Sequence, residues 1–134
     1  MSDTQARQTV LVIDDTPDTV KILKRILEFW GYRVLTTNNG EEGLALAEAE
    51  APDLILLDIL MPKMKGRDVC ARLKANPKTQ HTAVIFLTAL GLPDHVKAGM
   101  DLGADDYLTK PFEPEDLKAR IESCLLRKRA RTDA

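Results

Sequence analysis

The stretch from Leu54 to Pro62, LILLDILMP, constrains the fold more than any other part of the chain. Four apolar residues precede a single carboxylate, Asp58, and further apolar residues follow it. A run that is apolar at successive positions is typical of a strand buried on both faces of a parallel sheet. Asp58 stands where this strand should end, and open α/β sheets bind ligands at the carboxyl ends of their strands. Asp58 is therefore either a strand-end cap or a reactive residue.

Strand patterns and helix patterns alternate along the chain. Apolar runs bounded by turn residues predict strands, and apolar residues at helical spacing predict helices between them. The expected strands cover 9–13, 32–36, 54–57, 83–87 and 107–109, and the expected helices cover 17–30, 41–50, 66–74, 93–102 and 113–126. Such alternation requires right-handed crossovers, so we expect an α/β fold with a parallel five-stranded sheet between two layers of helices.

Local signals mark where these helices begin and end. Thr16 precedes Pro17 and is the expected N-cap of the first helix, which Gly31 should end. The helix expected over 93–102 is the weakest of the five, because it is more polar than the others and contains Gly99.

The composition fits one globular domain. The chain has 134 residues, of which 44% are hydrophobic and 30% charged, and its net charge of −2 gives no reason to expect membrane or direct nucleic acid binding. We expect a disordered amino-terminus over 1–8, a domain over 9–126 and a basic tail over 127–134. Cys70 and Cys124 fall on apolar helix faces and should be buried thiols. No signal peptide or bilayer-spanning run is visible, so a cytoplasmic location is expected.

Five polar residues are expected at one edge of this sheet: Asp14, Asp15, Asp58, Thr88 and Lys110 each follow a strand. Each residue alone is most simply a turn, cap or surface residue. Together, three carboxylates would repel and raise one another's pKa unless positive charge joins them. Lys110 supplies one positive charge, and a set of oxygen ligands with open positions suits Mg²⁺.

A site of this kind can accept a phosphoryl group on a carboxylate. Asp58 is the best candidate for the nucleophile, which would become an aspartyl phosphate. Asp14 and Asp15 are candidate metal ligands. The Thr88 hydroxyl can donate a hydrogen bond to a phosphoryl oxygen, and Lys110 can pair with the transferred oxygens.

The motifs around these residues resemble the receiver domain of two-component response regulators. They read VIDD up to Asp15, LLDILMP around Asp58, LTA around Thr88 and YLTKPF around Lys110, and the similarity spans 9–126. The resemblance implies a flavodoxin-like (βα)5 fold with strand order 2-1-3-4-5. It also implies a protein that is not an enzyme toward other substrates, and that catalyses only its own phosphoryl transfer and a slow autodephosphorylation.

The resemblance further implies a phosphorylation-activated signalling switch. Asp58 would take a phosphoryl group from a sensor histidine kinase or a histidine phosphotransfer protein. Mg²⁺ would be held by Asp14, Asp15, Asp58 and the backbone carbonyl of Leu60. A cis peptide bond would precede Pro111.

In the implied switch, Thr88 moves toward the phosphoryl group and Tyr107 rotates into the space that Thr88 leaves. The signalling surface would comprise the helix over 93–102, the strand over 107–109 and the helix over 113–126. An output protein or domain, of unknown identity, would read this surface, and a phosphorylation-dependent homodimer is a further expectation.

Three residues depart from the commonest receiver pattern. Lys65 stands where the family often has Asp or Asn, so a favourable helix cap is lost. Leu60 and Leu90 occupy positions that influence how fast water removes the phosphoryl group. Leucine cannot orient the attacking water, so we expect slow autodephosphorylation.

Three other classes fit the chain less well. A flavodoxin-like FMN binder would need a phosphate-binding loop after the first strand, where Asp14 and Asp15 would repel the phosphate. A hydrolase of the haloacid-dehalogenase type would carry an Asp-x-Asp motif there and a cap over its substrate. A pseudo-receiver that acts only by binding would lack a site residue, whereas all five are present.

Overall fold

Five parallel strands form one sheet in the computed structural model, which describes residues 7–89, 97 and 100–133. The strands are β1 (Thr9–Ile13), β2 (Arg33–Thr37), β3 (Leu54–Asp58), β4 (Ala83–Ala89) and β5 (Asp106–Lys110). Their order in the sheet is β2-β1-β3-β4-β5, and each pair of neighbours is parallel. The expected α/β fold and its 2-1-3-4-5 strand order are confirmed.

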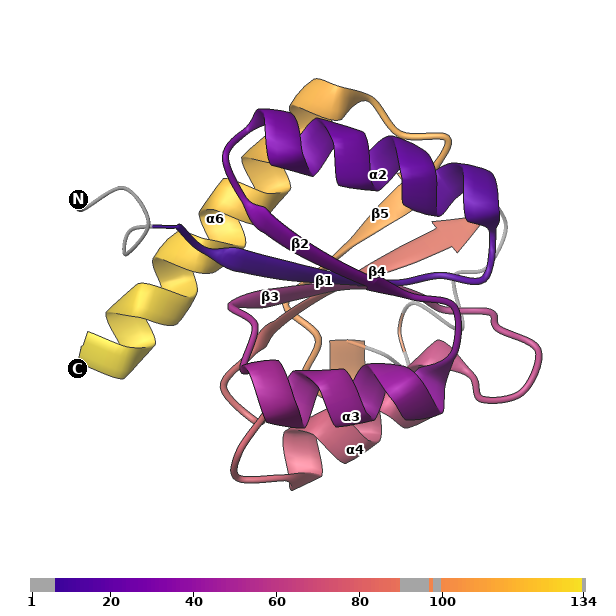
Figure 1. Ribbon diagram of the computed structural model, residues 1–134. Helices are drawn as coiled ribbons and strands as arrows, with labels where there is room; N and C mark the ends of the chain where they lie inside the picture. Colours follow the sequence, from indigo (N-terminus) through magenta and orange to yellow (C-terminus); the bar gives the residue numbers. More distant parts are fainter. Residues whose placement is uncertain (1–6, 90–96, 98–99, 134) are drawn as a thin grey trace.

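Helices cover both faces of this sheet. Four lie in the described part of the chain: α2 (Pro17–Phe29), α3 (Gly40–Glu50), α4 (Gly66–Ala75) and α6 (Pro114–Asp133). Figure 1 shows α2 and α6 on one side of the sheet and α3 and α4 on the other. The expected three-layer sandwich is therefore present.

Alternate residues of the central strands fill two separate cores. Val10 and Val12 of β1 pack toward α2 and α6, whereas Leu11 and Ile13 pack toward α3 and α4. All five residues of β3 are buried, which accounts for the unbroken apolar run before Asp58. Each fully buried aliphatic side chain contributes roughly 1.5–3 kcal/mol to folding, so the strands that end at the acidic residues are firmly held.

The ends of the helices follow the expectations in part. Gly31 has a φ of +93° directly after the C-cap of α2, as a glycine at this position should. Thr16 occupies the N-cap position of α2, but its side chain makes no capping hydrogen bond. Its backbone N–H instead donates to Asp14 Oδ1 at 2.9 Å. Lys65 precedes α4 without a side-chain cap, as expected.

Two elements run two or more residues further at their carboxyl ends than the sequence patterns indicated. β4 continues through Thr88 to Ala89 because both residues still pair with β5. α6 continues to Asp133 rather than ending at residue 126, since the residues that follow include good helix formers and no glycine or proline. Lys128 thereby reaches Asp53, with 3.8 Å between Nζ and Oδ1.

Several expectations fall largely outside the described residues. They concern the helix over 93–102, Leu90 and most of the amino-terminal segment 1–8. Lys97 and Met100, which are described, are helical. Both cysteines are buried free thiols, as expected. Within 7–89, 97 and 100–133, no helix has the length and apolarity needed to cross a bilayer.

Replacing Gly66 tests how tightly the loop after β3 packs on the strand. A Cβ added there would overlap the backbone oxygen of Asp58 and lie 2.7 Å from Cα of Ile59. Helix propensity alone predicts that Gly66→Ala stabilises the protein by about 0.5–1 kcal/mol. The clash with backbone should reverse this sign, and we expect a loss of about 1–3 kcal/mol in urea unfolding.

Arg67→Ala, in the same first turn of α4, is the matched control. Arg67 is partly exposed, so its replacement should change the free energy of unfolding by no more than about 0.5 kcal/mol. A stabilised Gly66→Ala protein would contradict the close packing of α4 on Asp58.

Candidate functional site

Three carboxylates meet where β1 and β3 end. Ile13 and Leu57 are partners in the register of these strands, which brings Asp14 and Asp58 to neighbouring positions. Asp14, Asp15 and Asp58 each offer an oxygen, and these oxygens lie within 4.8 Å of one another. Asp14 is 0% exposed and Asp58 6%, whereas Asp15 is only partly buried. The cluster is therefore enclosed by the sheet and open on the side of Asp15.

Lys110, at the end of β5, supplies positive charge to this cluster. Its Nζ lies 2.9 Å from Asp14 Oδ2 and 3.8 Å from Asp58 Oδ2. The peptide bond between Lys110 and Pro111 is cis, as the family resemblance implies. The side chain of Lys110 remains 24% exposed, so it can exchange one partner for another at the mouth of the site.

The loop after β3 closes around Asp58. The backbone N–H of Leu60 donates to Asp58 Oδ1 at 3.1 Å, which orients the carboxylate. The side chain of Leu60 is 42% exposed and thus stands at the rim of the site. Gly66 approaches Asp58 from the other end of the loop, and its N–H donates to the carbonyl of Ile59 at 3.0 Å.

Thr88 and Tyr107 lie on adjacent strands beside the cluster. Thr88 is one residue beyond Leu87, the register partner of Asp58, and it is 2% exposed. Its hydroxyl donates to the carbonyl of Ala89 at 3.2 Å. Tyr107 pairs with Phe86, two residues before Thr88, so both expected switch residues belong to the same face of the sheet.

Burial raises the pKa of Asp58 to about 7. The neighbouring Asp14 carboxylate and a hydrogen bond with Asp15 also act to raise this pKa, while the Lys110 ammonium and the Leu60 N–H act to lower it. The value of about 7 is the net result of these effects. Because this pKa exceeds the usual 3.8, the folded protein binds the proton more tightly than the unfolded chain. The stability that follows is present at low pH and is lost as the pH rises toward 7.

Lys110 brings one positive charge to three carboxylates, so it does not balance their negative charge when all three are ionised. The available ligands are carboxylate oxygens, which are hard donors, and the cluster is open to solvent beside Asp15. Small hard cations such as Mg²⁺ prefer such ligands and retain several waters. The residues therefore fit a divalent cation in both charge and donor type.

Sequence reasoning missed two contributions to the geometry. Thr37, at the end of β2, is buried, and its carbonyl accepts a hydrogen bond from the Asp14 N–H at 3.2 Å. Gly66 was expected only as the start of a helix, yet its lack of a side chain lets the loop lie against Asp58. A glycine a few residues after a strand-end aspartate is the signal that could have suggested this close approach.

Known proteins share both the sequence pattern and this architecture. The model of the response regulator receiver domain matches residues 10–122. The DNA-binding dual master transcriptional regulator RpaA of Synechocystis is 44% identical over 88% of this chain and 49% of its own length. The chain thus spans about half the length of the curated relatives it matches.

Solved structures resemble the chain over nearly its full length. A response regulator receiver domain protein from Methanospirillum hungatei has a TM-score of 0.88 and 29% identity, with 94% of this chain and 99% of that chain covered. The receiver domain of a sensor histidine kinase from Pseudomonas aeruginosa has a TM-score of 0.82 and 28% identity, with 90% of this chain and 98% of that chain covered. The latter structure contains a magnesium ion coordinated in the active-site cleft.

Three findings agree with one another. The receiver-domain model matches most of the chain, the curated relatives share its sequence pattern, and three carboxylates meet in one cluster. The chain belongs to the response regulator receiver domains of two-component systems.

Proposed function

We propose that Asp58 is the phosphoacceptor of a switch that a histidine kinase or histidine phosphotransfer protein controls. One observation carries this proposal: Asp58 is the carboxylate that Lys110 approaches without pairing closely, at 3.8 Å, while Lys110 pairs with Asp14 at 2.9 Å. The Leu60 N–H holds Oδ1 of Asp58, and the ammonium of Lys110 faces Oδ2 from 3.8 Å.

In the proposed reaction, Asp58 Oδ2 forms a bond to the phosphorus of a phosphohistidine. The bond between phosphorus and the histidine nitrogen breaks, and the electron pair stays on the leaving imidazole. Lys110 then turns toward the new phosphoryl oxygens, and Thr88 offers them a hydroxyl donor. Only the ionised carboxylate is nucleophilic, so conditions that lower the pKa of Asp58 favour transfer.

Asp14, Asp15, Asp58 and the Leu60 carbonyl would hold Mg²⁺. When bound, the ion supplies positive charge that offsets the carboxylates and the incoming phosphoryl oxygens. The close approach of the Asp14, Asp15 and Asp58 oxygens, within 4.8 Å of one another, supports this assignment because it gathers three hard oxygen donors in one place.

A pocket beside the site supports the docking of a protein-borne phosphoryl donor. Lys110 lines an open pocket of about 400 Å³ together with Thr19, Ile22, Pro111 and Phe112. Most of the lining residues are apolar, so the pocket offers a donor protein a place to dock next to the site.

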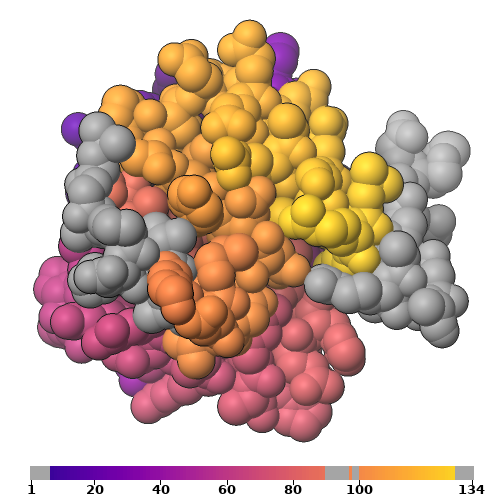
Figure 2. Space-filling model, turned by 180° about the vertical axis from the view of Figure 1, so that it is seen from behind, coloured from indigo at the N-terminus to yellow at the C-terminus, as the bar shows by residue number. Residues whose placement is uncertain are grey.

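Phosphorylation would be read out through Thr88 and Tyr107. An acyl phosphate carries more negative charge than the carboxylate and adds strong acceptor oxygens, so the Thr88 hydroxyl gains a better partner than the carbonyl of Ala89. Tyr107 would then turn inward and alter the surface around β5. Figure 2 shows this surface, with the segment of β5 (orange) exposed between α6 (yellow) and the residues of α4 (pink).

The phosphoacceptor assignment is tested with a small phosphodonor and Mg²⁺, followed by intact-mass measurement. The wild-type protein should gain one phosphoryl mass, and Asp58→Asn should gain none because an amide is not nucleophilic. Asp53→Asn, at the other end of β3, is the matched control and should be phosphorylated like the wild type. Equal labelling of Asp58→Asn would refute the assignment.

The lifetime of the phosphoryl group tests the role of Leu60. Its apolar side chain at the rim cannot orient an attacking water, so the phosphorylated protein should last for minutes or longer in Mg²⁺ buffer. Leu60→Asn should shorten this lifetime, whereas Leu126→Asn, at an even more exposed leucine on α6, should not. A wild-type half-life of seconds would show that Leu60 does not slow hydrolysis.

A further inference from the structure

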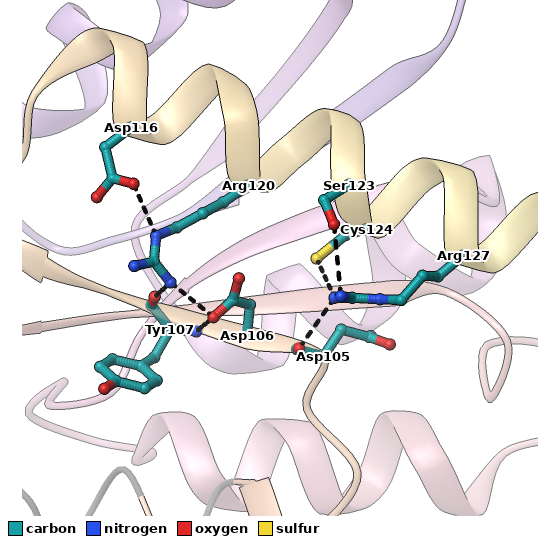
Figure 3. Close-up of polar contacts among 8 residues, drawn as sticks. All are labelled: Asp105, Asp106, Tyr107, Asp116, Arg120, Ser123, Cys124 and Arg127. Atoms are coloured by element: carbon teal, nitrogen blue, oxygen red, sulfur yellow. Dashed lines mark hydrogen bonds and ion pairs between the residues drawn. The ribbon is translucent and has the colours of Figure 1, made fainter.

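Tyr107 occupies an outward position on the edge strand β5. Its side chain is 41% exposed, although its neighbour Leu108 is 2% exposed in the core. Figure 3 shows the ring of Tyr107 beyond the strand, beneath a row of polar side chains that descend from α6. Arg120 is the member of this row that reaches the residue.

One guanidinium contacts both the backbone and the ring of Tyr107. Arg120 Nη1 donates to the Tyr107 carbonyl at 2.9 Å, and Arg120 Cζ lies 5.8 Å from the centre of the ring. A cation at this distance from an aromatic ring is attracted by the negative charge of the ring face. Arg120 therefore holds the strand and also favours the present orientation of the side chain.

Two carboxylates fix the guanidinium in this place. Arg120 Nη1 donates to Asp106 Oδ1 at 2.8 Å, and Nε donates to Asp116 Oδ1 at 3.0 Å (Figure 3). Asp106 Oδ1 also accepts the backbone N–H of Tyr107 at 2.8 Å. Because the planar fork of an arginine is rigid once it is held at two points, its position relative to Tyr107 is well defined.

We propose that Arg120 is a positioning residue that holds Tyr107 outward and so limits the active-like population of the unphosphorylated protein. This inference rests on the proposed function, since it takes Tyr107 as the switch residue. A group shifts an equilibrium only through interactions that differ between the two states. The bond to the Tyr107 carbonyl can persist when the side chain rotates, but the ring leaves the guanidinium when it turns inward.

The ring contact alone sets how far Arg120 should shift the ratio of inward to outward Tyr107. Cation–π contacts at exposed sites change a population ratio by about two- to fivefold. Loss of the guanidinium should therefore raise the inward-to-outward ratio of Tyr107 by about that factor.

Arg127 provides a matched control on the same helix. It lies seven residues after Arg120, and its Nη2 donates to the carbonyl of Asp105 at 3.3 Å, just as Arg120 binds the carbonyl of Tyr107. Its side chain also contacts Cys124 and Ser123, and the described residues show no ring contact for it (Figure 3). Arg127→Gln thus removes the same charge and a similar backbone bond without affecting Tyr107.

The test uses the chain labelled with 3-fluorotyrosine and observed by ¹⁹F NMR. The chain contains two tyrosines, Tyr32 and Tyr107, so Tyr107→Phe assigns both signals. Beryllium fluoride, an acyl phosphate mimic, gives the position of the inward signal. In the unphosphorylated protein, Arg120→Gln should move the Tyr107 signal toward that position, and Arg127→Gln should leave it in place.

Initial rates of phosphorylation provide the second readout. With a small phosphodonor and Mg²⁺, Arg120→Gln should react about two- to fivefold faster than the wild type, and Arg127→Gln at the wild-type rate. In a Tyr107→Ala background, Arg120→Gln should give no acceleration, because no ring remains to be held. Arg120→Lys keeps the charge and serves as a control for misfolding. It should change the Tyr107 signal and the phosphorylation rate less than Arg120→Gln does.

The outcomes separate this inference from the proposed function. If the wild type is phosphorylated on Asp58 but Arg120→Gln changes neither the Tyr107 signal nor the rate, the positioning role is wrong. An acceleration that persists without the Tyr107 ring would overturn it as well. If Asp58 is not phosphorylated in the wild type, the proposed function fails. A Tyr107 signal that Arg120→Gln shifts and Arg127→Gln does not would then still show that Arg120 contacts the ring.

Discussion

The burial of Asp14 is the constraint on which this structure depends. A carboxylate with no exposed surface must be compensated, and Lys110 does so from 2.9 Å. These residues lie 96 positions apart, at the ends of β1 and β5, so the pair forms only when β1, β3, β4 and β5 take their places side by side. The site is therefore a product of the whole sheet, and the two apolar cores that hold the strands also hold the charges.

Part of this arrangement could be predicted because it depends on local patterns. The apolar run before Asp58 predicted a strand buried on both faces, and β3 is buried throughout. The parallel sheet then required its strand-end residues to share one edge, and it brings Asp14, Asp15 and Asp58 together. The strand order came from the family resemblance, because alternation alone does not specify which strands are neighbours.

Other features depend on contacts between distant segments, which periodicity does not reveal. Thr16 is a favourable N-cap residue, but its N–H is bound by Asp14 and its side chain caps nothing. Gly66 allows the loop to lie against the Asp58 backbone because it has no side chain. Arg120 has the spacing of an ordinary solvent-facing helix residue, and only the position of α6 beside β5 brings it to Tyr107. A single side chain on α6 thereby contacts the strand that carries Lys110.

The protonation state of the Asp58 carboxyl group in the absence of metal tests this account most directly. Carbon-13 NMR of the aspartate carboxyl groups, followed from pH 4 to pH 9 in EDTA and in Mg²⁺, reports it. Because burial and the Asp14 charge raise the pKa of Asp58 to about 7, its signal should titrate near neutral pH in EDTA. Saturating Mg²⁺ should move the midpoint to lower pH, since a cation favours the ionised form. A midpoint near pH 4 in EDTA, or a midpoint that Mg²⁺ leaves unchanged, would contradict the account.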